Sequence, residues 1–336
     1  MINRYSRQII FPSIGKKGQG KLSGSYVVTI GCGALGTMIT SSLVRAGVGK
    51  ISIIDRDFIE YHNLQRQILF DEDDIKNQLP KAIAATQHLK RINSSVEIEG
   101  IVADVNHTNI ETFIRNADLV LDGLDNFETR SLLNDAALKQ SIPWIYGGAI
   151  SSFGMTMTII PGTPPCFRCI RPNPAGMGTP LTCETAGVIG PAPFVIGSLQ
   201  AAEAIKILVG AKEINQDLIV IDVWDGTFTR IKVSPRPDCP ACHGKYEFLE
   251  GILRVRAVAL CGQNAVQVLN PTLGEFSLKE LATRLEAVGK VNYNEYMLNL
   301  VVDTREMVIF PDGRAIVKNT TDKSLARGLY AKYIGA

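Results

Sequence analysis

Short apolar runs rich in β-branched residues alternate with longer amphipathic stretches over the first 150 residues. The runs predict strands at residues 26–30, 51–55, 96–102, 118–122 and 143–146. The stretches between them predict helices from about residue 36 to 46, at 82–92 and at 126–140. Because strands that are apolar throughout alternate with helices, this half predicts a Rossmann-like, mostly parallel sheet that is covered on both faces.

The pattern changes after residue 150, where an antiparallel strand is expected at 153–160 and a Pro- and Gly-rich loop at 161–182. A helix is expected at 193–209, followed by a strand pair at 218–223 and 227–233 around Asp225-Gly226. We therefore expect the parallel sheet to continue into an antiparallel half, within one domain over residues 1–243 whose nucleotide-binding half is about residues 1–150.

Residues 252–336 predict a separate small α+β unit. Strands are expected at 254–260, 297–302, 307–310 and 314–317. Ser277 and Glu280 form a capping-box pattern that opens a helix to about residue 288, and Thr321 or Asp322 opens the last helix.

Charge and composition exclude some classes of protein. The 336 residues include 35 basic and 33 acidic side chains, a net charge of +2, and no long basic run. Binding to nucleic acid by bulk electrostatics needs a basic surface, so no nucleic-acid partner is expected. The N-terminal residues lack the apolar core of a signal peptide, and no uninterrupted apolar stretch approaches the width of a bilayer. We expect a cytoplasmic protein without a membrane partner.

Four of the seven cysteines form two Cys-x-x-Cys pairs, Cys166 with Cys169 and Cys239 with Cys242. Disulfides are rare in reducing compartments, whereas two such pairs supply the four thiolates of a closed zinc site. A closed site has no open position for a substrate, so we expect structural Zn²⁺ that joins two distant segments. A redox pair, or coincidence, is the alternative.

A glycine-rich turn follows the first predicted strand and contains Gly31, Gly33 and Gly36. This spacing permits a tight turn and lets the backbone approach phosphates at a helix N-terminus. Asp55 ends the second predicted strand, where a carboxylate can bind ribose hydroxyls. Together they favour an adenine nucleotide over a structural glycine turn, although dehydrogenases, flavoproteins and adenylating enzymes all use this pattern.

Polar residues beyond Asp55 suit a triphosphate better than a nicotinamide. Asn63, Gln65 and Arg66 lie within one short run, and Lys81 opens the next helix. Asp125, at the carboxyl end of a predicted strand, could hold Mg²⁺ beside phosphates. As alternatives, the cations could be solvated surface charges and Asp125 could cap the helix that begins at Asn126.

Taken together, these motifs resemble the ThiF/MoeB/HesA family of adenylyltransferases, which are related to ubiquitin-activating enzymes. The resemblance covers about residues 3–243. It rests on the residues 4–9 (RYSRQI), 31–36, Asp55-x-Asp57, 63–67, Pro80-Lys81, Asp125-Asn126 and both cysteine pairs. The C-terminal unit is similar, more loosely, to an extension of thiazole-type and molybdopterin-type members from Gram-positive bacteria.

The resemblance implies an enzyme that uses ATP and Mg²⁺ to adenylate the C-terminal Gly-Gly of a ubiquitin-like sulfur carrier protein, with release of pyrophosphate. It implies that Asp55 binds the ribose, that Asn63, Arg66 and Lys81 bind the phosphates, and that Asp125 binds magnesium at the catalytic position. The other residues that it places at the nucleotide are the three glycines, Asp57, Gln65 and Asn126. Arg7 would reach into the partner's active site in a homodimer.

Cys183 resembles the cysteine that joins the activated carrier through an acyl persulfide in thiazole-type members. The alternative is a buried cysteine with no catalytic part. The C-terminal unit contains only Cys261 and lacks the loop of a sulfur-transfer site, so we expect a separate sulfur donor such as a cysteine desulfurase or a rhodanese.

Several functions remain open at this stage. A ThiS-like carrier of thiazole and thiamine biosynthesis is favoured by Cys183 and by the C-terminal unit, and a MoaD-like carrier of molybdopterin biosynthesis is the alternative. Adenylation of a peptide or a tRNA base would use the same chemistry. Outside adenylation, the alternatives are an NAD-dependent dehydrogenase and a non-catalytic scaffold that binds a carrier.

Overall fold

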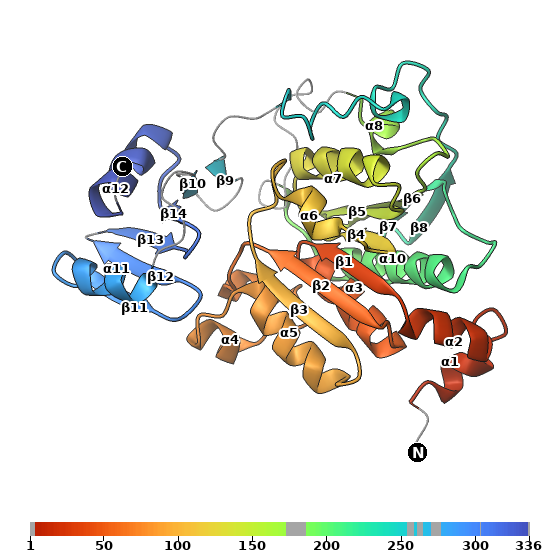
Figure 1. The fold of residues 1–336 in the computed structure, drawn as a ribbon, viewed down its shortest axis with the longest axis horizontal. Helices are drawn as coiled ribbons and strands as arrows, with labels where there is room; N and C mark the ends of the chain where they lie inside the picture. Colours follow the sequence, from red (N-terminus) through yellow and green to blue (C-terminus); the bar gives the residue numbers. More distant parts are fainter. Residues whose placement is uncertain are drawn as a thin grey trace. The chain divides into compact units, whose positions relative to one another are not determined.

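The computed structural model describes residues 4–172, 186–253, 259–260, 265–269, 277–302 and 304–334. These residues form two compact units, the first ending at residue 253 and the second beginning at residue 259 (Figure 1). The first unit contains the strands β1 (Tyr26–Ile30), β2 (Lys50–Asp55), β3 (Glu97–Val102), β4 (Leu119–Asp122), β5 (Trp144–Ile150), β6 (Phe153–Ile159), β7 (Leu218–Asp222) and β8 (Thr227–Ile231). Its helices are α1 (Ser6–Ile10), α2 (Gly15–Ser23), α3 (Ala34–Ala46), α4 (Glu72–Lys76), α5 (Lys81–Ile92), α6 (Ile110–Ile114), α7 (Phe127–Lys139), α8 (Phe167–Ile170) and α10 (Pro191–Val209), with the short 3-10 helices η1 (Tyr61–Asn63) and η2 (Ala241–His243).

The strands of the first unit form one sheet in the order β3-β2-β1-β4-β5-β6-β7-β8. Strands β1 to β5 pair in parallel, and β5 to β8 pair in antiparallel fashion. The predicted fold class, a Rossmann-like sheet that continues into an antiparallel half, is confirmed. Its parallel part follows from the strand–helix alternation, since parallel neighbours need a crossover connection.

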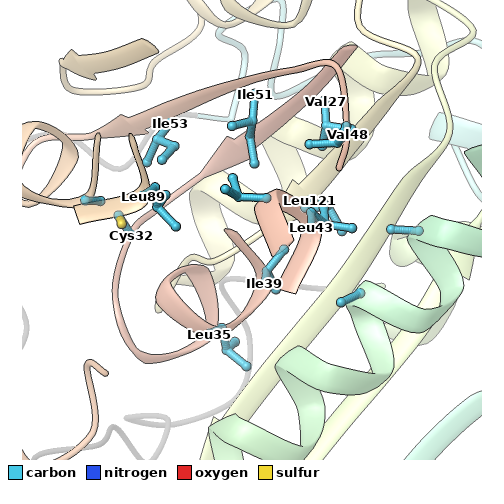
Figure 2. Close-up of a cluster of buried hydrophobic side chains, with 14 of the residues drawn as sticks. Val27, Cys32, Leu35, Ile39, Leu43, Val48, Ile51, Ile53, Leu89 and Leu121 are labelled. Carbon is cyan, nitrogen blue, oxygen red and sulfur yellow. The ribbon is translucent and has the colours of Figure 1, made fainter. Parts of the chain in front are cut away.

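Neighbouring residues of the parallel strands point to opposite faces, and both faces are buried. Val27 and Ile53 belong to a core with residues of α3, α5 and α10, and Figure 2 shows them with Ile39 of α3. Val28 and Ile54 belong to a second core on the other face, with residues of α6 and α7 and the cysteine pairs. This burial explains why the strands are apolar throughout rather than alternating.

Helix α10 is long and apolar enough, with a mean hydropathy of 1.4, to cross a membrane by length and composition. It instead packs against α3 and against β5 and β6 (Figure 1). The buried Gln200 donates to the carbonyl oxygens of Asp122 and Ile145, and Glu203 pairs with Lys206. Its apolar composition is therefore that of a core helix that packs on the sheet beside α3.

The second unit is an antiparallel sheet with two helices. Its strands are β9 (Ala259–Leu260), β10 (Ala265–Leu269), β11 (Lys290–Tyr293), β12 (Leu298–Val302), β13 (Arg305–Ile309) and β14 (Arg314–Lys318), in the order β11-β12-β13-β14-β10-β9, and its helices are α11 (Leu278–Leu285) and α12 (Lys323–Tyr333). Ser277 accepts from the backbone N–H of Glu280, and Asp322, rather than Thr321, caps the last helix. The strand predicted at 254–260 is described only at its last two residues.

Some short elements were not expected from the sequence. Helix α2 carries three glycines, which disfavour helices, yet it buries Leu22, and Gly18 allows Val209 of α10 to approach closely. Helix α8 lies inside the segment predicted to be a loop, and residues 173–182 of that segment lie outside the described residues. Tertiary packing decides both cases against local propensity.

Candidate active site

Strands β1 to β4 run in parallel, so the segments that follow them meet at one edge of the sheet. These segments are the glycine turn at 31–36 after β1, residues 56–57 after β2, residues 103–104 after β3 and residues 123–126 after β4. Open parallel sheets bind ligands at this carboxyl edge. The sequence-predicted nucleotide residues of these segments therefore lie at one edge.

The three predicted glycines have different roles. Gly31 has a φ of +91°, and a Cβ there would collide with the carbonyl oxygen of Gly123. A Cβ on Gly36 would collide with the carbonyl oxygen of Gly31. At Gly33, by contrast, a Cβ would meet nothing nearer than Gln67 Nε2, 3.9 Å away. Gly31 and Gly36 allow the tight turn, and Gly33 leaves its backbone open to the approach of a phosphate.

Asp55 ties the end of β2 to this turn. Its buried carboxylate accepts the backbone N–H of Cys32 at 2.5 Å and that of Asp57 at 2.7 Å. Burial raises the pKa of Asp55. Each carboxylate oxygen has a further lone pair, so the group can also accept a ribose hydroxyl beside the glycine turn.

Lys81, the first residue of α5, is buried beside Asp57, with its Nζ 3.0 Å from Asp57 Oδ2. Burial by itself would lower the pKa of Lys81, but the carboxylates of Asp57 and Asp55, and also that of Asp125, raise it above its ordinary value. The ammonium is therefore charged at neutral pH. The alternative that Lys81 is a solvated surface charge is wrong.

The run from Asn63 to Gln67 divides into structural and accessible positions. Asn63 is buried and its Oδ1 accepts the backbone N–H of Glu60, which closes η1. Arg66 is half-buried and donates to the carbonyl oxygen of His62, and Gln65 is exposed.

Gln67, which lies in the matching run 63–67 but has no predicted site role, is buried beside Gly33. Its Oε1 has no hydrogen-bond partner in the part of the chain that the structure describes. Buried polar atoms are almost always paired, so this oxygen marks a place where a ligand can supply a donor.

Asp125 is exposed in the turn after β4. Asn126, not Asp125, caps α7, because its Oδ1 accepts the backbone N–H of Thr129 at 2.9 Å. The alternative in which Asp125 caps the helix is therefore wrong. Asn126 has a structural role, and Asp125 is left facing solvent within electrostatic range of Lys81.

A buried ion pair beneath Asp125, which the sequence analysis did not predict, holds this turn. Arg130 Nε lies 2.9 Å from Asp122 Oδ2, and the two side chains are 5% and 0% exposed. Arg130 also donates to the carbonyl oxygens of Leu124 and Gly147, and Asp122 accepts the backbone N–H groups of the same two residues. The guanidinium thus fixes the backbone that presents Asp125.

Arg7 is not brought to this edge of its own chain. Arg7 is exposed on α1, and the adjacent Gln8 donates to the carbonyl oxygen of Ala46, the last residue of α3. Helix α3 begins at the glycine turn and is about 20 Å long, so Arg7 lies beside its far end. Cys183 lies outside the described residues.

The four cysteines of the two pairs form one cluster, as predicted. Their sulfur atoms all lie within 4.8 Å of one another, and the distances from Cys166 to Cys239 and from Cys169 to Cys242 are 3.6 Å. A tetrahedron with Zn–S bonds of about 2.3 Å has edges of about 3.8 Å, so the cluster fits zinc and is too open for disulfides. Because the two pairs meet, a separate redox role for each pair is disfavoured.

Helix α7 supports the cluster. Asn134 donates to the sulfur of Cys166 at 3.8 Å and accepts the backbone N–H of Phe167 at 3.0 Å. The hydrogen bond from Cys166 lowers the pKa of the Cys239 thiol to about 5, whereas burial raises the pKa of the Cys242 thiol to about 12. Four thiolates this close need a cation between them, which is what zinc supplies.

Comparison with known proteins identifies relatives of the whole chain. The model of the ThiF family matches residues 5–241. The sulfur carrier protein ThiS adenylyltransferase of Bacillus subtilis (strain 168) is 42% identical, over 100% of both chains. The SAMP-activating enzyme E1 of Haloferax volcanii is 37% identical, over 77% of this chain and 96% of its own.

A solved structure supports the same fold. The crystal structure of E. coli MccB with ATP is 25% identical and has a TM-score of 0.62, over 72% of this chain and 75% of that chain. The family match over residues 5–241, and the similarity to the Bacillus protein over its whole length, show that this chain belongs to the ThiF family.

Proposed function

We propose that this chain is an enzyme that uses MgATP to adenylate the C-terminal Gly-Gly carboxylate of a ubiquitin-like sulfur carrier protein of the ThiS type. The observation that carries the proposal is the position of the buried Lys81 ammonium at the carboxyl edge, beside Asp57 and within electrostatic range of Asp55 and Asp125. The name and full-length similarity of the Bacillus subtilis relative support the choice of substrate.

The edge offers binding groups for the ribose and for the phosphates of ATP. The backbone at Gly33 is open to phosphate, and Asp55 is placed to accept ribose hydroxyls. Lys81 and Arg66 supply positive charge for the phosphates. Asn63, Gln65, Asp57 and Asn126 complete the proposed set, Asn63 and Asn126 chiefly by holding the backbone.

The reaction needs no general base, because the carrier's terminal carboxylate is already ionised at neutral pH. Its oxygen attacks the α-phosphorus of ATP, the bond from that phosphorus to the bridging oxygen breaks, and pyrophosphate leaves. The products are an acyl-adenylate and pyrophosphate. The barrier comes from crowded negative charge, which Lys81 and Arg66 reduce and which Mg²⁺, held by Asp125, would reduce further.

Other partners and sites belong to this proposal. In a homodimer, Arg7 of one copy would complete the active site of the other, consistent with its distance from the edge of its own chain. Cys183 would form the covalent link with the activated carrier, and a separate donor, such as a cysteine desulfurase or a rhodanese, would supply sulfur. The four-cysteine cluster would hold structural zinc.

ATP–pyrophosphate exchange tests the proposed function. Exchange should depend on a ThiS-like carrier that ends in Gly-Gly and should fall at least about 100-fold in Asp125→Asn, which removes the magnesium-binding charge. Asp73→Asn, which changes an exposed carboxylate on α4, should exchange at the wild-type rate.

Each other result points to one of the alternatives. Exchange with only a MoaD-like carrier would assign the molybdopterin pathway instead. ATP binding without exchange with either carrier would favour the scaffold or another adenylation substrate, and binding of NAD without ATP would favour the dehydrogenase, which family membership already argues against.

A further inference from the structure

Arg171 lies beside the helix that follows Asp125, and it forms no ion pair with a described residue. It follows α8 directly and is half-buried, and its guanidinium carbon lies 3.6 Å from the centre of the Phe127 ring. At this distance the guanidinium packs on the face of the ring. Its Nε is buried and has no hydrogen-bond partner in the part of the chain that the structure describes. Arginines that leave solvent are almost always paired, so Arg171 marks a place where a ligand can supply an anion.

The neighbouring arginine is not available to such a ligand. Arg130 lies 5.5 Å from the same ring, but it is buried on Asp122 and donates to two backbone carbonyl oxygens. Arg171, by contrast, lies toward β5, because it is within electrostatic range of Tyr146 and its backbone N–H donates to Phe167 of α8. Phe167 packs on Tyr146, with the two ring centres 5.0 Å apart. The unpaired cation is therefore on the β5 side of the turn after β4.

The strand order divides the proposed active site into two sides. In the order β3-β2-β1-β4-β5, the helices α3 and α5, which follow β1 and β2, pack on one face, and α7, which follows β4, packs on the other. Open parallel sheets bind ligands in the crevice where this switch occurs, here between β1 and β4. The glycine turn and Lys81 lie on the β1 and β2 side, where the nucleotide is proposed to bind. A second substrate that attacks this nucleotide has the β4 and β5 side left to it, which is the side of Arg171.

We propose that Arg171 binds the C-terminal carboxylate of the carrier protein and positions it for attack on ATP. The assignment rests on the proposed function and names the residue that receives its second substrate, whereas Lys81 and Arg66 act on the phosphates. A guanidinium donates hydrogen bonds and stays protonated, so it can hold the carboxylate oxygen that does not attack while the other oxygen forms the bond to phosphorus. Cys169, two residues earlier, belongs to the four-cysteine cluster, which thus holds the backbone from which Arg171 projects.

Binding of two carriers, measured by calorimetry, tests the assignment. One is a ThiS-like carrier that ends in Gly-Gly, and the other is the same carrier with a C-terminal amide, which has no terminal charge. The wild-type protein should bind the carboxylate form about 10- to 100-fold more tightly than the amide form, the strength of a hydrogen bond to a charged group. Arg171→Met, which keeps an apolar side chain on Phe127 without the charge, should reduce this preference to about 2-fold or less. Arg171→Lys should retain part of it, and the control Arg115→Met, at an exposed arginine after α6, should retain all of it.

Kinetics gives a second readout of the same assignment. In ATP–pyrophosphate exchange, Arg171→Met should raise the KM for the carrier about 10-fold or more and leave the KM for ATP unchanged within about 2-fold. An equal rise in both constants would assign Arg171 to the phosphates and overturn the proposal.

The binding outcomes are also distinguishable. Equal weakening of both carriers in Arg171→Met would show that Arg171 only supports the fold, and an undiminished preference for the carboxylate would show that another group binds it. Either result would overturn the proposal, as would equal affinity of the wild-type protein for the two carriers. If the wild-type protein binds neither carrier, the proposed function itself fails.

Discussion

Arg130→Met tests whether the buried ion pair with Asp122 holds the carboxyl edge together. The substitution removes the charge and keeps much of the volume, and it leaves the fully buried Asp122 carboxylate without its cation. The carbonyl oxygens of Leu124 and Gly147 lose a donor as well. Removing one partner of a buried pair costs about 3–5 kcal/mol, so we expect the free energy of unfolding of the first unit to fall by about 4 kcal/mol at pH 7.5.

Urea unfolding followed by tryptophan fluorescence measures this loss. The chain has two tryptophans, Trp144 and Trp224, both in the first unit, and Trp144 is fully buried beside β4. In the double variant Asp122→Asn/Arg130→Met, the free energy of unfolding should fall by at least about 1 kcal/mol less than the sum of the losses in the two single variants. The reason is that the double variant contains no lone buried charge.

The pH dependence gives an independent check of the same reasoning. Burial already raises the pKa of Asp122, and Arg130 opposes that rise. Without Arg130 the pKa rises further, so the folded variant takes up a proton more readily than the unfolded chain, and stability is lost as pH rises through the folded pKa. The deficit of Arg130→Met should be smaller at pH 5 than at pH 7.5. The role of the pair would be refuted if Arg130→Met lowered the free energy of unfolding by less than about 1 kcal/mol, or if the effects of the two single variants were additive. It would also be refuted if the loss of stability in Arg130→Met were independent of pH.

Three further predictions concern the metal cluster, a buried carboxyl and the phosphate site. Purified protein should release about one zinc ion per chain to a colorimetric chelator after thiol modification. Cys239→Ser should lose the metal and melt at a lower temperature. Cys32→Ala, outside the cluster, should keep the metal. Burial raises the pKa of Asp135 to about 6, so this carboxyl stabilises the fold most below about pH 4. The free energy of unfolding should fall by about 3 kcal/mol as pH rises through 6. An Asp135→Asn variant whose urea midpoint changes with pH as the wild type does would contradict this. Lys81→Met should weaken MgATP binding about 10- to 100-fold in calorimetry, and an effect no larger than that of Lys76→Met, at an exposed lysine, would rule out a phosphate contact.

The sequence by itself determined the strands and the three longest helices of the parallel half, and the edge at which the site lies. Strands β1 and β4 lack an alternation of apolar and polar positions because each is buried on both faces, and this burial appears in the sequence as short, mostly apolar runs. Once these strands are known to be parallel, the positions of Gly33, Asp55 and Asp125 at one edge follow from chain direction alone.

Only the tertiary structure decided which side chains meet. Arg56 pairs with Asp104, 48 residues away, because β2 and β3 are neighbours in the sheet, and Cys166 meets Cys239 across 73 residues. Arg130 reads in the sequence as an ordinary helix arginine, and only the fold shows that it is buried on Asp122. Propensity and periodicity act over a few residues, whereas burial and charge pairing depend on distances that the folded sheet sets.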